Sequence, residues 1–192
     1  MKHMYTVAVL SALFVSLASQ TVPTAAAAPA VVDRLSLDRY LGTWYEIASV
    51  KPPFQQACAC VTANYTLRED GSVQVTNTCR RGGPEGEEVS IRGSALPTDD
   101  PAKFSVFFYG PVPSEPNYWV VLLDPDYRFA VVSGGADFTP FWILSRTTAL
   151  EPEVLSGIES QLVGMGFDLS ELMATPQAGC WTESRHGKAL SF

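Results

Sequence analysis

Hydrophobic and polar positions alternate along eight short stretches of the chain between residues 42 and 145. Side chains of a β-strand point alternately to its two faces, so this alternation predicts strands with one buried face. Turns rich in glycine, proline and aspartate separate the stretches, and the Asp70-Gly71 turn predicts a hairpin. The predicted strands are residues 42–50, 61–67, 72–79, 89–96, 103–109, 118–123, 129–133 and 141–145. Eight strands in this order favour an all-β, up-and-down antiparallel β-barrel.

The periodicity changes after residue 150. Pro152 suits the first position of a helix, because its fixed φ is already helical. Apolar residues then recur at helical spacing, which predicts one C-terminal helix packed on the outside of the barrel. They are Val154, Leu155, Ile158, Leu162 and Met165. We also predict a short strand near Leu172 and one helical turn before the first strand, between Leu35 and Tyr40.

Residues 1–30 have the pattern of a secretory signal peptide, with several small-residue cleavage sites before Ala30. Lys2 gives a basic start, and the apolar core from Val7 to Leu17 is too short to span a bilayer comfortably, which disfavours a retained anchor. No cysteine in or just after this leader offers a site for a lipid anchor. We therefore expect a secreted or periplasmic protein with one domain over residues 31–180 and a polar tail over 181–192.

Charge narrows the range of partners. The chain carries 13 basic and 20 acidic residues; loss of the leader removes Lys2 and no acidic residue, which leaves a net charge of −8. An acidic protein has little general affinity for nucleic acid or for anionic lipid surfaces. We expect no nucleic-acid partner, no stable membrane insertion, and a monomer or weak dimer.

The histidines argue against catalysis. The chain has two, His3 in the leader and His186 in the tail, so the predicted barrel has no histidine for general base chemistry or for a metal. Glu46 falls on the inward face of the first strand by parity, where a charge is costly unless it is hydrogen-bonded. We interpret it as a structural hydrogen-bonding group at the base of the barrel, and we expect no catalytic residue, metal or cofactor.

Four cysteines remain after the leader: Cys58, Cys60, Cys79 and Cys180. An even number in an exported chain favours two disulfides. The alternative of a four-cysteine zinc site would need two paired knuckles, whereas Cys79 and Cys180 each stand alone.

Three separated motifs together resemble the lipocalin family, in particular its bacterial and apolipoprotein D-like branch. They are Tyr40-Leu41-Gly42-Thr43-Trp44-Tyr45-Glu46-Ile47-Ala48, Asp124-Pro125-Asp126-Tyr127-Arg128, and Trp142-Ile143-Leu144-Ser145-Arg146-Thr147. The resemblance spans about Leu35 to Cys180. It implies a calyx that binds small hydrophobic molecules, with Trp44 at the closed barrel base covered by Arg146 in a cation–π contact.

The resemblance also implies a disulfide between Cys60 and Cys180, which leaves Cys58 and Cys79 for the second one. Strand parity makes that second pair awkward, because Cys79 falls on the inward row and Cys58 on the outward row. A bulge would reconcile them. The swapped pairing, Cys60–Cys79 with Cys58–Cys180, is the alternative.

Alternation also selects the residues that line the interior. An eight-stranded barrel has room for side chains or for one small ligand. The alternative for each of these residues is that it only fills the core. The predicted ligand-binding residues are Ala63, Tyr65, Val75, Asn77, Phe104, Val106, Phe108, Tyr118 and Val120.

We therefore predict a secreted carrier or scavenger of a fatty acid, lysophospholipid, sterol or pigment. The second hypothesis is a lipocalin-like enzyme or chaperone that acts on membrane lipids or pigments. A third is a partner-binding module that uses the loops at the open end, around residues 52–54 and 111–113.

Overall fold

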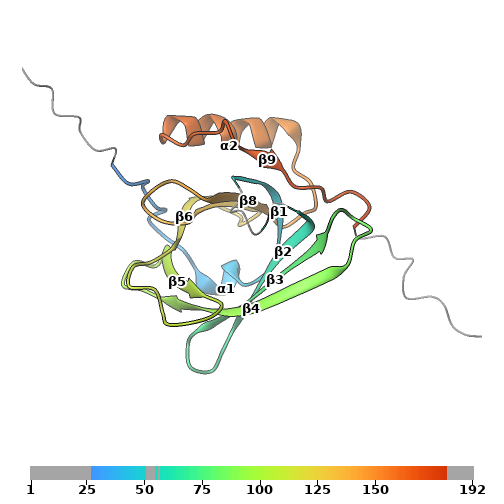
Figure 1. The fold of residues 1–192 in the computed structure, drawn as a ribbon. Helices are drawn as coiled ribbons and strands as arrows, with labels where there is room; N and C mark the ends of the chain where they lie inside the picture. Colours follow the sequence, from blue (N-terminus) through green and yellow to red (C-terminus); the bar gives the residue numbers. More distant parts are fainter. Residues whose placement is uncertain (1–26, 51–54, 56, 181–192) are drawn as a thin grey trace, which may run out of the picture.

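The computed structural model describes residues 27–50, 55 and 57–180. Seven antiparallel strands pair in chain order from β2 to β8, and β1 pairs with both β8 and β2, which closes an eight-stranded barrel. Figure 1 looks along this barrel. The strands are β1 (Gly42–Val50), β2 (Cys58–Leu67), β3 (Val73–Arg81), β4 (Glu88–Pro97), β5 (Lys103–Phe107), β6 (Tyr118–Leu123), β7 (Phe129–Ser133) and β8 (Phe141–Ser145).

The predicted barrel is confirmed, and the differences lie at strand ends. β2 begins three residues before the predicted start, because backbone pairing with β3 continues through Cys58. β5 stops at Phe107 instead of Tyr109, because Tyr109 and Gly110 already belong to the proline-rich connection to β6. Alternation locates the middle of a strand, whereas hydrogen bonding to the neighbouring strand decides its ends.

Two helices flank the barrel. The short α1 (Leu37–Tyr40) lies at the end of the barrel that carries the β2–β3, β4–β5 and β6–β7 turns, which we call the base; the other end is the mouth. The longer α2 (Pro152–Gly164) packs on the outside, as predicted, and β9 (Met173–Ala174) adds to the edge of β1 (Figure 1). Among the described residues, no helix has the length and hydrophobicity needed to cross a membrane.

Because side chains alternate along the strands, they contribute to two separate hydrophobic layers. In β7, Ala130 and Val132 face the barrel interior, whereas Val131 between them packs into the layer under α2. Ile158 and Leu162 of α2 are almost fully buried in that second layer. Val154 is 36% exposed, so its predicted place on the buried helix stripe is wrong. It lies in the first turn of α2, where the neighbouring Leu155 packs against the layer instead.

Both disulfides are present: Cys60 bonds to Cys180, and Cys58 bonds to Cys79. This is the pairing that the resemblance implied, and not the swapped one. The β2–β3 register shifts by one residue between Ala59 and Thr62, and Cys60 has a φ of 54°. This β-bulge places one extra residue on β2, which reconciles the parity of Cys58 and Cys79.

The C-terminal segment fills the space where β1 and β2 part. These strands pair only near the base, from Gly42–Tyr65 to Tyr45–Thr62. Farther toward the mouth, the Cys60 amide donates to the Pro176 carbonyl, and the Gln177 side chain donates to the carbonyls of Glu46 and Val61. The segment therefore seals the barrel wall, and the Cys60–Cys180 disulfide fixes it there.

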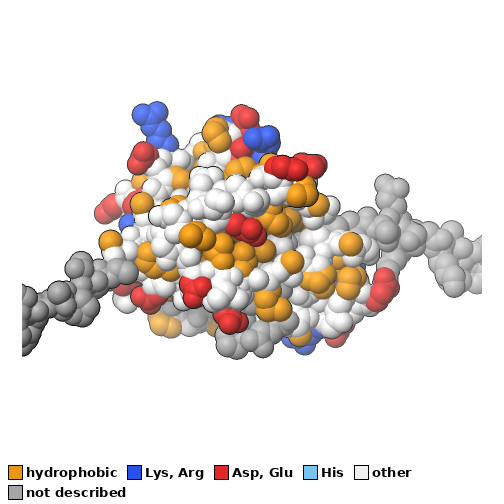
Figure 2. Space-filling model, turned by 90° about the horizontal axis from the view of Figure 1, so that it is seen from above, with side chains coloured by type: hydrophobic (Ala, Val, Ile, Leu, Met, Phe, Trp, Pro, Cys, Tyr) orange, Lys and Arg blue, Asp and Glu red, His pale blue; other side chains and the backbone are white. Residues whose placement is uncertain are grey.

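The outer surface carries both apolar and polar side chains. On the α2 side of the molecule, shown in Figure 2, apolar side chains are scattered among polar and acidic ones. Val163 of α2 and Met173 of β9 are 60% and 57% exposed. Single exposed apolar residues are ordinary on protein surfaces, so this face carries no argument for function.

Candidate ligand cavity

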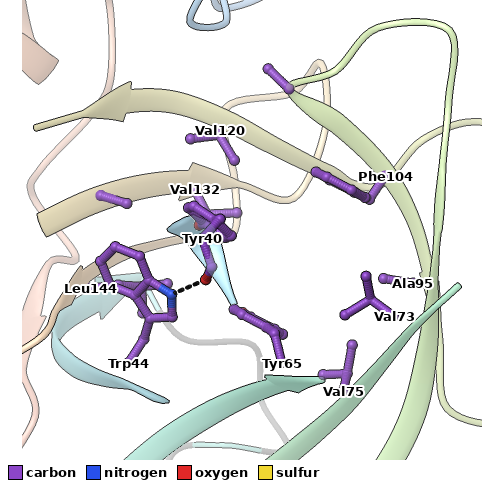
Figure 3. Close-up of a cluster of buried hydrophobic side chains, with 12 residues drawn as sticks. Tyr40, Trp44, Tyr65, Val73, Val75, Ala95, Phe104, Val120, Val132 and Leu144 are labelled. Carbon is purple, nitrogen blue, oxygen red and sulfur yellow. Dashed lines mark hydrogen bonds between the residues drawn. The ribbon is translucent and has the colours of Figure 1, made fainter. Parts of the chain in front are cut away.

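The base of the barrel is closed by a stack of Trp44 and Arg146. Trp44 is fully buried, and its indole nitrogen donates a 2.8 Å hydrogen bond to the Tyr40 carbonyl (Figure 3). The Arg146 guanidinium carbon lies 3.7 Å from the centre of the indole ring. Its nitrogens also donate to the carbonyls of Arg39, Leu41 and Thr43, each at 2.8 Å. The guanidinium thus satisfies the backbone that enters β1 while it covers the indole.

Gly42 allows the chain to make this approach. Its φ is +87°, a left-handed conformation that side chains with a Cβ adopt rarely. The guanidinium of Arg146 also lies 3.6 Å from the position of a Cβ. The left-handed backbone therefore explains why a glycine stands two residues before Trp44.

Above this stack lies an apolar cavity inside the barrel. Its walls come from α1 and from the strands β2 to β6, and Figure 3 shows most of the lining side chains turned toward one another. The volume of the cavity is about 20 Å³, counted as the space that the centre of a water molecule can occupy. This volume is enough for about one water-sized group. The lining residues are Leu37, Tyr40, Tyr65, Val73, Ala95, Phe104, Val106 and Tyr118.

Three tyrosine hydroxyls meet in this otherwise apolar cavity. The Tyr118 hydroxyl lies 2.8 Å from that of Tyr40 and 3.0 Å from that of Tyr65. The rings of Tyr40 and Tyr65 are stacked with centroids 5.8 Å apart, and the Tyr118 ring meets Tyr65 edge-on. We call these three residues the tyrosine cluster. The hydroxyls are fully buried and add no polar surface to the cavity as it stands, so a ligand oxygen contacts them only when lining side chains move.

Comparisons with known proteins agree with this geometry. The model of the lipocalin-like domain matches residues 35–177 of the chain. The chain belongs to the lipocalin family. Temperature-induced lipocalin-1 of Arabidopsis thaliana is 40% identical over 163 residues, which cover 80% of this chain and 86% of that protein. Outer membrane lipoprotein Blc of Citrobacter freundii is 36% identical, covering 93% and 99%, and mouse apolipoprotein D is 32% identical, covering 79% and 82%.

Solved structures show the same lipocalin fold. Insecticyanin of the tobacco hornworm Manduca sexta superposes with a TM-score of 0.60 at 20% identity, covering 81% of this chain and 88% of that one. The cockroach allergen Per a 4 superposes with a TM-score of 0.58 at 22% identity, covering 76% and 90%. Lipocalins generally bind small hydrophobic ligands, and most are carriers without enzymatic activity.

The lipocalin barrel brings four of the nine predicted ligand-binding residues to the cavity wall: Tyr65, Phe104, Val106 and Tyr118. The others lie beside it in the same interior. Val75 and Val120 are buried in the inner core, and Ala63 and Phe108 pack against that core. The side-chain oxygen of Asn77 is buried and has no hydrogen-bond donor within reach.

The prediction missed four lining residues. Val73 and Ala95 lie on the strands β3 and β4, so side-chain alternation could have identified them. Val73, for example, shares the face of Val75. Leu37 and Tyr40 belong to α1, to which strand parity does not apply. Their apolar spacing was visible in the sequence, but nothing in it showed that α1 turns these side chains into the barrel.

Glu46 is a structural hydrogen-bonding group, but it does not lie at the base. Its carboxylate is 2% exposed and accepts hydrogen bonds from Ser49, Thr175 and Gln55. The base location expected from the sequence is therefore wrong: Glu46 lies at mid-strand, where β1 meets the C-terminal segment. Among the described residues, no group of three or more histidine, cysteine or acidic side chains is arranged to hold a metal.

Burial keeps the tyrosine cluster protonated. Removal from water raises the pKa of Tyr65 to about 12, and it raises the pKa of Tyr40 and of Tyr118 as well. A phenol that loses its proton inside an apolar cavity leaves a charge with no solvent around it. The three hydroxyls are therefore neutral hydrogen-bonding groups near neutral pH.

These pKa shifts predict a loss of stability in alkali. In the unfolded chain Tyr65 ionises near its ordinary value of 10.0, whereas in the folded protein it holds its proton until about pH 12. The unfolded state therefore binds fewer protons between these two values, so the free energy of unfolding falls as pH rises through this window. Tyr65 alone accounts for about 3 kcal/mol, and Tyr40 and Tyr118 act in the same direction.

Urea denaturation at about pH 9 and at about pH 11.5 measures most of this loss, about 2 kcal/mol for Tyr65 at the higher pH. The Tyr65→Phe variant has no proton to release at this position, so its loss of stability over the same window is expected to be smaller. An equal loss in the variant and the parent protein would show that Tyr65 is not buried as the structure has it.

Proposed function

We propose that this lipocalin binds a small hydrophobic ligand inside the barrel and carries or scavenges it outside the cytoplasm. The observation that supports this most directly is the apolar cavity above Trp44, whose wall includes the rings of the tyrosine cluster. Ligand sites of this class are apolar hollows with a few polar groups that fix orientation. Fatty acid, lysophospholipid, sterol and pigment are the candidate ligand classes that the sequence suggests.

The size of the cavity sets a condition on binding. Because it holds about one water-sized group, a whole lipid needs lining side chains to change rotamer. Phe108 and Val106 line the way from the cavity toward the mouth and are only partly buried, so they can move at modest cost. We expect a slender, flexible ligand to enter more readily than a rigid one with several rings.

The export part of the proposal rests on the two disulfides and on the leader. Disulfides persist in oxidising compartments and are rare in the cytosol. The predicted signal peptide covers residues 1–30, most of which lie outside the described residues. We propose a secreted or periplasmic location, in accordance with both.

Binding is tested by titrating the protein with fatty acids, retinoids and carotenoids while recording tryptophan fluorescence. Trp44 and Trp142 both belong to or pack against the inner core, so a bound ligand is expected to quench them. Ala95→Leu fills the cavity and should weaken binding at least about tenfold, because the added methyl groups take the ligand's space. Ala149→Leu, at an exposed position, is the matched control and should bind normally.

Saturable binding that Ala95→Leu alone weakens is the expected result. Absence of saturable binding by every ligand class, in a protein whose thermal unfolding is cooperative, would overturn the proposal. Equal binding by Ala95→Leu and the parent would place the site outside this cavity and would overturn it as well.

A further inference from the structure

The wall of the cavity carries no basic side chain, since none of the lysine and arginine residues that the structure describes lines it. Arg146 lies against Trp44 and donates its hydrogen bonds to the carbonyls of Arg39, Leu41 and Thr43. Its charge acts on the three tyrosines through space, but these hydrogen bonds go to the backbone and not to the tyrosine hydroxyls. A ligand carboxylate drawn into this space would be desolvated without a cationic partner.

The tyrosine cluster, in contrast, has one proton to spare. Three hydroxyls carry three protons, and two hydrogen bonds join them, one between Tyr118 and Tyr40 and one between Tyr118 and Tyr65. Whichever hydroxyl donates in each bond, one proton remains without a protein acceptor among the described residues. All three hydroxyls also keep lone pairs that can accept a hydrogen bond. The cluster can therefore donate one hydrogen bond to a neutral oxygen and accept one from a hydroxyl.

Asn77 adds a second uncompensated group on the same inner face. It lies two residues after Val75 on β3, toward the mouth, and pairs with Ala63 of β2 and Ile91 of β4. Its side-chain oxygen is buried with no donor. A carbonyl oxygen in this state repels an anionic oxygen and attracts a hydroxyl.

We propose that the ligand is an uncharged lipid, whose hydroxyl or carbonyl oxygen docks on Tyr40, Tyr65 and Tyr118, and that the barrel discriminates against the corresponding carboxylate. This inference rests on the proposed function, since it names the chemical class that the same cavity takes. Fatty alcohols and neutral esters meet this requirement and are also slender and flexible, whereas a sterol meets it but is rigid. An ionised fatty acid meets it only if its carboxylate stays outside, in water at the mouth.

The test compares compounds that share one hydrocarbon chain. Dodecanol, methyl dodecanoate and dodecanoate are each titrated near neutral pH against the full-length mature protein. The readout is displacement of diphenylhexatriene, a fluorescent hydrocarbon without oxygen. We expect dodecanol to displace the probe at a concentration at least about tenfold lower than dodecanoate, because only the carboxylate leaves an unpaired charge in the barrel. Methyl dodecanoate should lie close to dodecanol.

Variants separate the hydroxyls from the shape of the cavity. Tyr118→Phe removes the central hydroxyl and keeps the ring, and it should weaken dodecanol about three- to tenfold while diphenylhexatriene binds as before. Tyr65→Phe serves the same purpose if the first variant does not fold. Tyr109→Phe, which changes a side chain that is 83% exposed, is the matched control and should alter nothing.

Each outcome decides between the two proposals. If dodecanoate binds as tightly as dodecanol, discrimination against charge is wrong and the carrier function stands. If Tyr118→Phe and Tyr65→Phe weaken diphenylhexatriene as much as dodecanol, the cluster maintains the cavity and does not contact the ligand oxygen. If neither the probe nor any dodecyl compound binds, the proposed function itself fails.

Discussion

Replacing both Cys60 and Cys180 by serine is expected to lower the free energy of unfolding by about 5 kcal/mol. The bond joins residues 120 positions apart, and closing so long a loop removes much of the conformational entropy of the unfolded chain. Loss of the bond also destabilises the native state, because the bond holds the C-terminal segment against the bulge of β2. There the Cys60 amide donates a 2.8 Å hydrogen bond to the Pro176 carbonyl. Urea denaturation of the oxidised proteins measures the difference.

The second disulfide provides the matched control. Cys58 and Cys79 are only 21 positions apart and join neighbouring strands, so their replacement by serine should cost about 3 kcal/mol. The larger loss for the Cys60–Cys180 pair is the expected order. The reverse order would mean that the C-terminal segment adds little to the closure of the barrel.

Trp44→Ala is expected to cost about 3 to 5 kcal/mol of folding free energy. The indole is fully buried and packs with the Tyr40 ring at a centroid distance of 5.0 Å. Its loss leaves a hollow at the base of the barrel, removes the hydrogen bond to the Tyr40 carbonyl and takes away the aromatic face beneath Arg146. Because Tyr40 lines the ligand cavity, ligand affinity should fall together with stability.

Trp119→Ala is the control for this substitution. Trp119 is also an indole on a barrel strand with a backbone hydrogen bond, but it faces outward and is only partly buried. Its loss should cost about 1 to 2 kcal/mol, since less apolar area leaves water in the native state. Thermal and urea unfolding of both variants gives the comparison. A loss for Trp44→Ala no larger than for Trp119→Ala would contradict its role as the plug of the base.

Most of the barrel was predictable because strand alternation is a local property. The hairpin through Asp70-Gly71, the inward row of Val73 and Val75, and the proline start of α2 each depend on residues close together in sequence. The contact between Trp44 and Arg146, 102 positions apart, followed from family resemblance and not from spacing.

The polar chemistry of the site was not predictable in the same way. Tyr65 and Tyr118 were both predicted to face inward. Alternation, however, gives only the face of the strand on which a side chain lies, and not how deep in the barrel its end lies. Their hydroxyls meet only because barrel closure brings β2 and β6 across one interior, with α1 adding Tyr40 from below. The burial that raises their pKa values is a property of this packing.

The sequence by itself determined the strand order, the outer helix, the family, and the inner and outer rows of the strands except where β-bulges shift the register in β1, β2 and β6. Only the tertiary structure decided the size of the cavity, the tyrosine cluster and the seal between β1 and β2 by the C-terminal segment. The physical reason is the range of the interactions: alternation and turn chemistry act over a few residues, whereas cavity volume, burial and hydroxyl geometry arise from segments that meet only when the barrel closes.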